Sequence, residues 1–290
     1  MIKRVCIVGL GLMGGSLGYA FRTRGQVDEI VGHDCSRDVC TRAVERGCVQ
    51  TATPVLSEAV ADADVVFVCT PIHLVAPVVR DICAHVKKGT IITDVGSTKT
   101  QIVDQLKDLP RKDVFFVGGH PMAGSDRSGI DAARPDLFQG ALYFLTPVPE
   151  TQPRALDELD QFIQRLTPRV EQLSPQKHDA LVALASHLPF MVATALVQTF
   201  KNSQQPPLEE LLNVVSTGFR DSTRVAAHPP DWGKDVVISN HENVLKELDR
   251  FLEAANELRK KIAERDEQAL YQWFSEVSVF RRGMYASRPS

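Results

Sequence analysis

The chain has 290 residues, of which 43% are hydrophobic and 24% are charged, and its formal net charge is −3 at pH 7. This length and composition are typical of a globular protein that buries a substantial core in one large domain or two ordinary ones. The slightly acidic balance argues against nucleic acid as the main partner. All six cysteines lie between Cys6 and Cys83 without a metal-type C-x-x-C spacing, which favours reduced thiols in a cytoplasm over a secreted disulfide framework.

The first apolar run stops at a glycine, and glycines then recur at the spacing G-x-G-x-x-G. Gly9 permits a tight turn from strand to helix, Gly11 lets the backbone approach a pyrophosphate, and Gly14 lets the helix lie close on the strand. The amides at the start of that helix would face the phosphates. The residues predicted to hold a dinucleotide at this turn are Gly9, Gly11, Leu12, Met13 and Gly14.

A second strand, residues 29–34, ends in Asp34, twenty residues past Gly14. At that place a carboxylate accepts hydrogen bonds from the adenosine ribose of NAD and repels the 2′-phosphate of NADP. The sequence therefore predicts NAD rather than NADP, although the nearby Arg37 is a residue type that tolerates the phosphate. The alternative is an ordinary turn with a surface aspartate.

Strands and helices alternate from residue 1 to about 174, which predicts a Rossmann-type, doubly wound α/β sheet with ligands at the carboxyl ends of its strands. Thr70 and Pro71, directly after the third strand, are predicted at the same cofactor site. The expected strands are residues 2–8, 29–34, 64–69, 90–94, 114–117, 141–146 and 169–173, and the expected helices include 12–24, 37–46, 74–86 and 154–166.

From Ser174 and Pro175, which are typical of a helix start, no strand pattern follows, so residues 175–290 are predicted to form an all-helical domain. Pro189 should kink its first helix, and a single helix is expected over 208–226. Apolar residues between 244 and 262 form a heptad seam that needs a partner, and the last helix offers an apolar face that would pack back on it. This domain is expected to make a homodimer.

Two stretches imitate membrane signals. Five glycines between residues 9 and 18 interrupt the apolar run after Lys3 and Arg4, so a signal peptide is not expected. Residues 180–200 carry no formal charge and are long enough to span a bilayer. Polar residues inside that run favour a helix buried among other helices, and no membrane partner is expected.

Polar side chains follow two neighbouring strands of the predicted sheet. Ser97 and Lys99 follow strand 90–94, and His120 follows strand 114–117. Histidine is the side chain best suited to move a proton near neutral pH, and the glycines around His120 suit close approach to a ligand. The alternative is a histidine that only caps or packs. No metal-type cluster or G-x-S-x-G motif appears, and His33, His73, His85, His178, His228 and His241 are assigned to surface or capping positions.

The helical half adds polar residues of its own. Ser186 and His187 lie within the uncharged helix and need partners there. Arg220 and Arg224 share one helical face, and an arginine there suits a bidentate clamp on a substrate carboxylate. Pairing of such an arginine with Asp221 or with a helix C-terminus is the alternative.

Five motifs occur in one order along the chain. They begin at Gly9, Asp94, Gly119, Ser186 and Gly218, and read GLGLMG, DVGSTK, GHPMAG, SHLP and GFRDSTR. The chain resembles the prephenate/arogenate (cyclohexadienyl) dehydrogenase family of tyrosine biosynthesis over essentially its whole length. The resemblance implies a Rossmann-type domain, a helical domain through which two subunits pair, and oxidative decarboxylation of a cyclohexadienol carboxylate to an aromatic product.

The resemblance also implies residue roles. His120 would accept the proton of the ring 4-hydroxyl as hydride leaves for the nicotinamide, and Ser97 would hold both His120 and that hydroxyl. Arg224 would bind a substrate carboxylate. The remaining pocket residues would be Ser186 and His187, together with Trp232 reaching the pocket of the other subunit.

One residue departs from the family pattern. Many members that prefer prephenate read S-H-L-P-H, whereas this chain has Phe190 at the last position. We therefore expect prephenate dehydrogenase activity that also extends to arogenate, and no appended regulatory or mutase domain after residue 290. A β-hydroxyacid dehydrogenase would need a lysine-centred motif in the helical domain, which we do not find. A non-catalytic NAD-binding protein would not need His120, Ser97 and Arg224 together.

Overall fold

The structure is a computed structural model that describes residues 2–25 and 27–286. It divides into two compact units, Met1–Asn243 and Val244–Ser290. The first unit contains the whole sheet and also the first helices that follow it. The predicted domain boundary at residue 174 lies where strands end in the described chain, whereas the division into compact units lies farther along the sequence.

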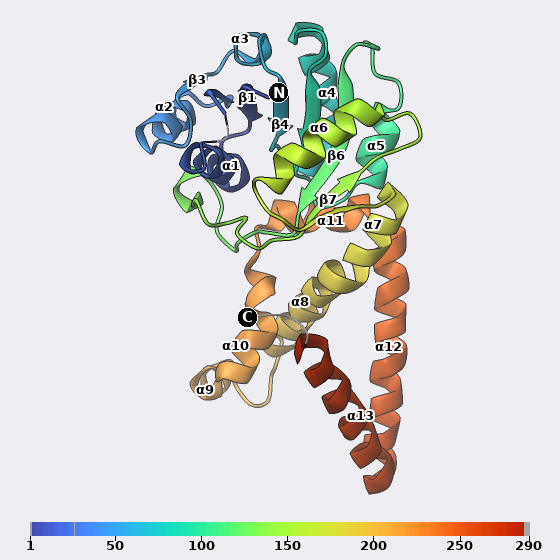
Figure 1. Ribbon diagram of the computed structural model, residues 1–290. Helices are drawn as coiled ribbons and strands as arrows, with labels where there is room; N and C mark the ends of the chain where they lie inside the picture. The colour runs from blue at the N-terminus through green and yellow to red at the C-terminus, as the bar shows by residue number, and fades with distance from the viewer. Residues whose placement is uncertain (1, 26, 287–290) are drawn as a thin grey trace. The chain divides into compact units, whose positions relative to one another are not determined.

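The first unit is built on one eight-stranded sheet in the order β3-β2-β1-β4-β5-β6-β7-β8 (Figure 1). Every neighbouring pair is parallel except β6 and β7, so the last two strands run against the others. Chain order reverses between β1 and β4, the switch point at which doubly wound sheets bind ligands. The strands are β1 (Arg4–Val8), β2 (Glu29–His33), β3 (Thr51–Thr53), β4 (Val65–Val68), β5 (Ile91–Asp94), β6 (Phe115–Pro121), β7 (Tyr143–Thr146) and β8 (Val170–Gln172).

Helices cover both faces of this sheet because side chains alternate between the faces along each strand. Val5 and Ile7 of β1 enter one core, and Cys6 and Val8 enter the other. Buried strands of this kind read as continuous apolar runs. The helices on the first face are α1 (Leu12–Thr23), α2 (Arg37–Glu45) and α6 (Pro153–Gln164), and those on the second are α3 (Leu56–Val60), α4 (Ile72–His85), α5 (Thr100–Leu106) and α11 (Pro230–Ser239).

The predicted α/β architecture is confirmed, with the strands at 141–146 and 169–173 at the outer edge. The sequence did not indicate β3 and α3. The strand has only three residues, none of them buried, and the helix has only five, so neither carries a periodic apolar pattern.

The helix expected to kink at Pro189 is interrupted just before it. Helix α7 (Pro175–Val182) passes into a π-helical segment, Ala183–His187, and then into α8 (Leu188–Lys201). Proline lacks an amide hydrogen, so it fits the first turn of α8, where it lies. A single π-helical turn is the usual form in which a π-helix occurs inside an α-helix.

This run, Pro175–Lys201, is the one described helix long and apolar enough to cross a membrane, with a mean hydropathy of 2.0 in its most apolar window. Only 28% of that window is buried. The predicted burial among helices is therefore not met within a single chain. Exposed apolar side chains on the run are Leu181, Leu184 and Leu196.

The single helix expected over 208–226 is in fact three short ones. Helix α9 (Leu208–Val214) ends at Val215, α10 (Thr217–Thr223) starts after the extended Ser216, and a 3-10 turn follows at Arg224–Ala227. The extended backbone of Val215 and Ser216 separates the two helices.

The second unit holds most of α12 (His241–Glu264) and all of α13 (Glu267–Ala286). Arg265, with φ of +52°, turns the chain between them, and Lys261 lies 5.7 Å from the Trp273 ring centroid. The predicted packing of the last helix along the whole seam is not found, since Phe251 and Phe280 remain 37% and 72% exposed.

Candidate active site

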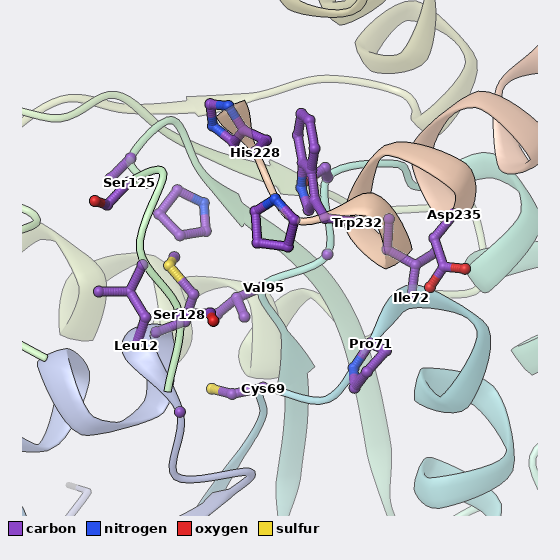
Figure 2. Close-up of a pocket in the computed structure, with 18 of the residues that line it drawn as sticks. Leu12, Cys69, Pro71, Ile72, Val95, Ser125, Ser128, His228, Trp232 and Asp235 are labelled. Atoms are coloured by element: carbon purple, nitrogen blue, oxygen red, sulfur yellow. The ribbon is translucent and has the colours of Figure 1, made fainter. Parts of the chain in front are cut away.

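A cavity of about 570 Å³ lies at the carboxyl ends of the central strands within the first unit. Three parts of the chain line it: the glycine turn after β1, the segments after β4, β5 and β6, and the helical residues from Ser186 to Asp235. Figure 2 shows His228 and Trp232 above this space and Cys69 below it, with Leu12 and Ser128 on one side. The cavity therefore joins the dinucleotide-type turn to the helical residues.

The glycine turn has the geometry that its spacing predicts. Gly9 has φ of +94°, a conformation that other residues rarely adopt, and its amide donates to the His33 carbonyl at 2.8 Å. A Cβ on Gly14 would lie 1.9 Å from the Gly9 carbonyl oxygen, so only glycine fits there. A Cβ on Gly11 would meet nothing within 4 Å, and Gly11 lines the cavity. Gly9 and Gly14 thus build the turn, and Gly11 leaves room for a ligand.

Asp34 is fixed at the end of β2 by backbone amides. Its carboxylate accepts from the Leu10 amide at 3.1 Å and from the Ser36 amide at 3.0 Å. The Thr70 hydroxyl oxygen is buried and has no hydrogen-bond partner in the part of the chain that the structure describes. Of the predicted cofactor residues, Gly11, Leu12, Met13, Thr70 and Pro71 line the cavity, whereas Gly9, Gly14 and Asp34 do not.

A buried ion pair supports the end of strand β6, which carries His120. Asp94 and Lys99 are completely buried and pair with each other. Asp94 also accepts from the Gly119 amide at 3.1 Å, and the Lys99 ammonium donates to the Gly119 carbonyl at 2.8 Å. Burial lowers the pKa of Lys99, although Asp94 opposes that shift. Lys99 therefore holds the strand ends together and does not line the cavity, contrary to the position expected for it.

The glycines before His120 also have a different role from the one predicted. A Cβ on Gly118 would lie 2.4 Å from the Thr146 hydroxyl, and one on Gly119 would lie 2.7 Å from the Asp94 carbonyl. These glycines let neighbouring strands approach each other closely. Gly124, with nothing within 4 Å of its Cβ position, is the one that faces open space.

His120 lines the cavity but is only 8% exposed. Its Nδ1 lies 2.8 Å from Nε2 of His178, and the Nδ1 of His178 lies 2.8 Å from Asp179. Burial lowers the pKa of His120 well below 6.5, and the nearby His178, Lys99 and His187 lower it further. His120 is thus neutral at neutral pH and able to accept a proton. The assignment of His178 to a surface or capping position is wrong, because it is completely buried beside His120.

Ser97 lines the same cavity, but its hydrogen bond differs from the expected one. Its hydroxyl accepts from Trp232 Nε1 at 3.2 Å, and in the described chain it does not bond to His120, whose Nδ1 is taken by His178. Trp232 therefore lines the pocket of its own chain. A contribution of Trp232 to the pocket of the other subunit stays a prediction.

The two polar residues of the interrupted helix point to different places. Ser186 lines the cavity. His187 is buried away from it, where its Nδ1 accepts from Asn240 Nδ2 at 3.2 Å. Burial lowers the pKa of His187 to about 4, against the opposing charge of Asp179. His187 is thus a buried neutral histidine and not the pocket residue that we expected.

The structure distinguishes the two candidate arginines. Arg220 is exposed and pairs with Asp221 at 3.3 Å, whereas Arg224 lines the cavity and has no ion pair among the described residues. Arg127, from the loop after β6, is a second cavity arginine that the sequence did not indicate. Two cationic groups therefore border the space beside His120.

Aromatic rings form one wall of the cavity. Phe190 is 7% exposed and packs edge-on against Trp232, with ring centroids 5.3 Å apart. Trp232 in turn lies 4.7 Å from the His228 ring. A Cβ on Gly233 would approach Phe190 to 2.8 Å, so the glycine makes space for the ring.

Sequence reasoning missed several residues of this site. They are His178 and Asp179 behind His120, and Arg127, His228 and Asp235 in the cavity wall, the last paired with His73 at 2.7 Å. No local pattern marks them. The one available signal in the sequence was the pair of adjacent polar residues, His178 and Asp179, directly before the uncharged run of residues 180–200.

Comparisons with known proteins agree with this geometry. Residues 17–172 match the family model "Prephenate dehydrogenase, nucleotide-binding domain", and residues 174–276 match "Prephenate dehydrogenase, dimerization domain". The chain is 31% identical to the prephenate dehydrogenase of Bacillus subtilis over 98% of its own length and 76% of the relative's length.

Two solved structures are similar over nearly the whole chain. One is prephenate dehydrogenase from Aquifex aeolicus in complex with hydroxyphenyl propionate and NAD+, with a TM-score of 0.90, 30% identity, and coverage of 98% of this chain and 99% of that one. The other is Synechocystis arogenate dehydrogenase, with a TM-score of 0.81, 34% identity, and coverage of 97% and 100%.

Proposed function

The chain belongs to the prephenate dehydrogenase family of dehydrogenases, and we propose that it oxidises and decarboxylates prephenate to 4-hydroxyphenylpyruvate with NAD, in tyrosine biosynthesis. The observation that carries this proposal is His120. It is a buried, neutral imidazole in one cavity with the glycine turn and with Arg224.

Each residue has a part in the proposed reaction. Arg224 and Arg127 bind substrate carboxylates, which places the ring hydroxyl near His120. His120 takes the hydroxyl proton, while bound NAD supplies the acceptor for the hydride from the same ring carbon. The C–C bond to the ring carboxylate breaks, its electron pair enters the ring, and CO2 leaves. The phenolate oxygen that results takes the proton back from His120. Aromatisation drives that loss, so the protein has only to orient the groups.

The residues present fit a dinucleotide. Gly11 leaves open space at the start of α1, whose first amides suit a pyrophosphate, and the buried Thr70 hydroxyl has a free hydrogen-bonding capacity. Asp34, directly after β2, would accept from the ribose hydroxyls, and a carboxylate in this place favours NAD over NADP. The test is kcat/KM with each cofactor, and a value with NADP that equals or exceeds the value with NAD would refute the assignment of Asp34.

Substrate preference depends on the side-chain end of the pocket. Phe190 offers neither a donor to the keto acid of prephenate nor a cation that repels the ammonium of arogenate. The similarity to both a prephenate and an arogenate dehydrogenase supports a second candidate, a cyclohexadienyl dehydrogenase that accepts both substrates. We expect kcat/KM values for the two that differ by less than about a hundred-fold, or about 3 kcal/mol. A larger ratio would assign specificity to another residue.

The first experiment is to add NAD and prephenate to the purified protein and to follow the near-ultraviolet absorbance of reduced nicotinamide. Turnover with release of CO2 supports the proposal. NAD binding without turnover of prephenate or arogenate would instead indicate a non-catalytic NAD-binding protein.

We further propose a homodimer formed through the helical domain, in a cytoplasmic enzyme. The match to a dimerization domain model supports it. So do the apolar side chains that a single chain leaves exposed on α7, α8, α12 and α13.

A further inference from the structure

Behind His120, a chain of buried hydrogen bonds leads away from the cavity. His178 is completely buried and Asp179 is 1% exposed. The contacts His120 Nδ1 to His178 Nε2 and His178 Nδ1 to Asp179 Oδ1 are both 2.8 Å. No part of the proposed reaction described above uses His178 or Asp179. Burying polar groups costs free energy. Because these two buried groups contact a residue proposed to react, they themselves are candidates for a role in the reaction.

Asp179 is held as an anion by its surroundings. Its two carboxylate oxygens accept from the backbone amides of Lys99 and Thr100, each at 2.8 Å, at the start of α5. Burial alone would raise the pKa of Asp179, but the hydrogen bonds from His178, Thr100 and Lys99 outweigh burial and lower it. The Phe144 ring packs edge-on against His178, with centroids 5.2 Å apart. Neither side chain is free to turn away.

The direction of the hydrogen bonds follows from this arrangement. A carboxylate only accepts, so the proton between His178 and Asp179 is on His178 Nδ1. In a neutral His178 the Nε2 then has only a lone pair, and it must accept from Nδ1–H of His120. His120 is left with an unprotonated Nε2, the nitrogen available to the cavity that the residue lines.

We propose that His178 and Asp179 are positioning residues that fix the tautomer of His120, so that Nε2 is the base that accepts the substrate proton. Once His120 is protonated, its Nδ1–H still donates to His178, and the Asp179 anion stabilises the new charge through that ring. This role deepens the proposed function and rests on it for the identity of the substrate, whereas the tautomer itself does not depend on turnover.

The direct test is histidine-selective ¹⁵N NMR of the intact protein, with the His120 signals assigned by their loss in His120→Asn. We expect a protonated Nδ1 and an unprotonated Nε2 in the wild type, and loss of that preference in His178→Phe. A wild-type His120 that carries its proton on Nε2 would overturn the proposal, whatever the activity. If the expected tautomer is present without prephenate turnover, the proposed function fails and the positioning role stands.

The kinetic test uses graded variants. We expect His178→Phe to lower kcat by about 10–100-fold, the usual cost of losing an outer hydrogen-bond partner. His178→Gln, whose amide oxygen accepts from His120 Nδ1, should recover part of that loss. Substrate KM and NAD affinity should change little in both. A wild-type kcat in His178→Phe would contradict the proposal.

Two further variants separate positioning from folding. Asp179→Asn should lower kcat, because a neutral amide no longer stabilises the charge that forms on His120 and His178. It should also lower stability, because one backbone amide of α5 loses its acceptor. His85→Phe is the matched control, since His85 is an exposed residue of α4 that pairs with Asp81, and it should retain wild-type kinetics. An Asp179→Asn protein that folds and keeps the wild-type kcat would reject the role of Asp179.

Discussion

At the scale of single residues, chemistry depends on what each side chain touches rather than on its type. The chain has eight histidines. His120 and His187 both lie at buried positions, and burial lowers the pKa of each. Of these two histidines, His120 borders the cavity and His187 does not, so His120 is the one placed to exchange a proton with a ligand.

We predict that His120→Asn lowers kcat by roughly 10²–10⁴, the usual contribution of a positioned general base. Its NAD affinity, measured by fluorescence titration, should barely change, because the glycine turn and Asp34, where NAD is expected to bind, are left intact. Near-normal turnover in this variant would reduce His120 to a structural role.

Arg224→Ala should act mainly on the substrate KM, because it removes a charge-assisted hydrogen bond to a carboxylate while leaving the base in place. Steady-state kinetics with saturating NAD would measure the effect. Arg220→Ala is the matched control, since Arg220 pairs with Asp221 at the surface. If Arg220→Ala raises the substrate KM and Arg224→Ala does not, Arg220 is the arginine that binds the substrate carboxylate.

At the scale of elements, the turn between β1 and α1 contains two glycines with separable roles. We predict that Gly14→Ala lowers both thermal stability and NAD affinity, because its Cβ would collide with the Gly9 carbonyl oxygen. Gly11→Ala should keep the wild-type melting temperature, since its Cβ meets nothing within 4 Å, yet bind NAD more weakly. Calorimetry of both variants, with and without NAD, makes the comparison. Equal NAD affinities of Gly11→Ala and the wild type would show that the pyrophosphate does not bind beside Gly11.

At the scale of the whole molecule, we predict a loss of stability in mild acid. His187 has an ordinary pKa of 6.5 when unfolded and about 4 when folded. The stabilisation that neutral His187 contributes to the folded chain is complete above pH 6.5 and is lost as the pH falls towards about 4. The reason is that the unfolded chain binds a proton at a higher pH than the folded chain does. The loss amounts to about 3 kcal/mol. Burial also lowers the pKa of His120, so His120 should add to the same loss of stability in acid.

The matched variant is His187→Asn, whose amide oxygen replaces Nδ1 as the acceptor from Asn240 but does not titrate. Urea unfolding across this pH range should show a flatter pH dependence for His187→Asn. An unchanged pH dependence would exclude His187 as a source of the acid sensitivity.

Assembly is the second prediction at this scale. Light scattering should give a mass twice the 32.0 kDa of one chain. Phe280→Glu should shift the equilibrium towards monomer, because Phe280 is 72% exposed in the single chain and a charge there opposes burial. Glu276→Gln, at another exposed position on α13, is the control. A monomeric wild type would refute the dimer.

The sequence by itself determined the α/β fold, the glycine turn and the presence of His120 and Ser97 near one site, whereas the family resemblance chose Arg224 over Arg220. Those features depend on local rules: a strand period, a turn that only glycine permits, and side chains placed after parallel strands. The alternation of apolar runs was long enough to predict all the sheet except the three-residue β3.

Only the tertiary structure decided the partners of those residues. His178, which is distant in sequence, contacts His120, and Lys99 forms a buried ion pair with Asp94. His187 lies outside the pocket and contacts Asn240. Trp232 lies beside Ser97 of the same chain. Apart from the Lys99–Asp94 pair, these contacts join segments far apart in the sequence, and no local period or spacing encodes which buried polar groups meet. They form because a buried hydrogen-bonding group must find a partner wherever the packed elements provide one.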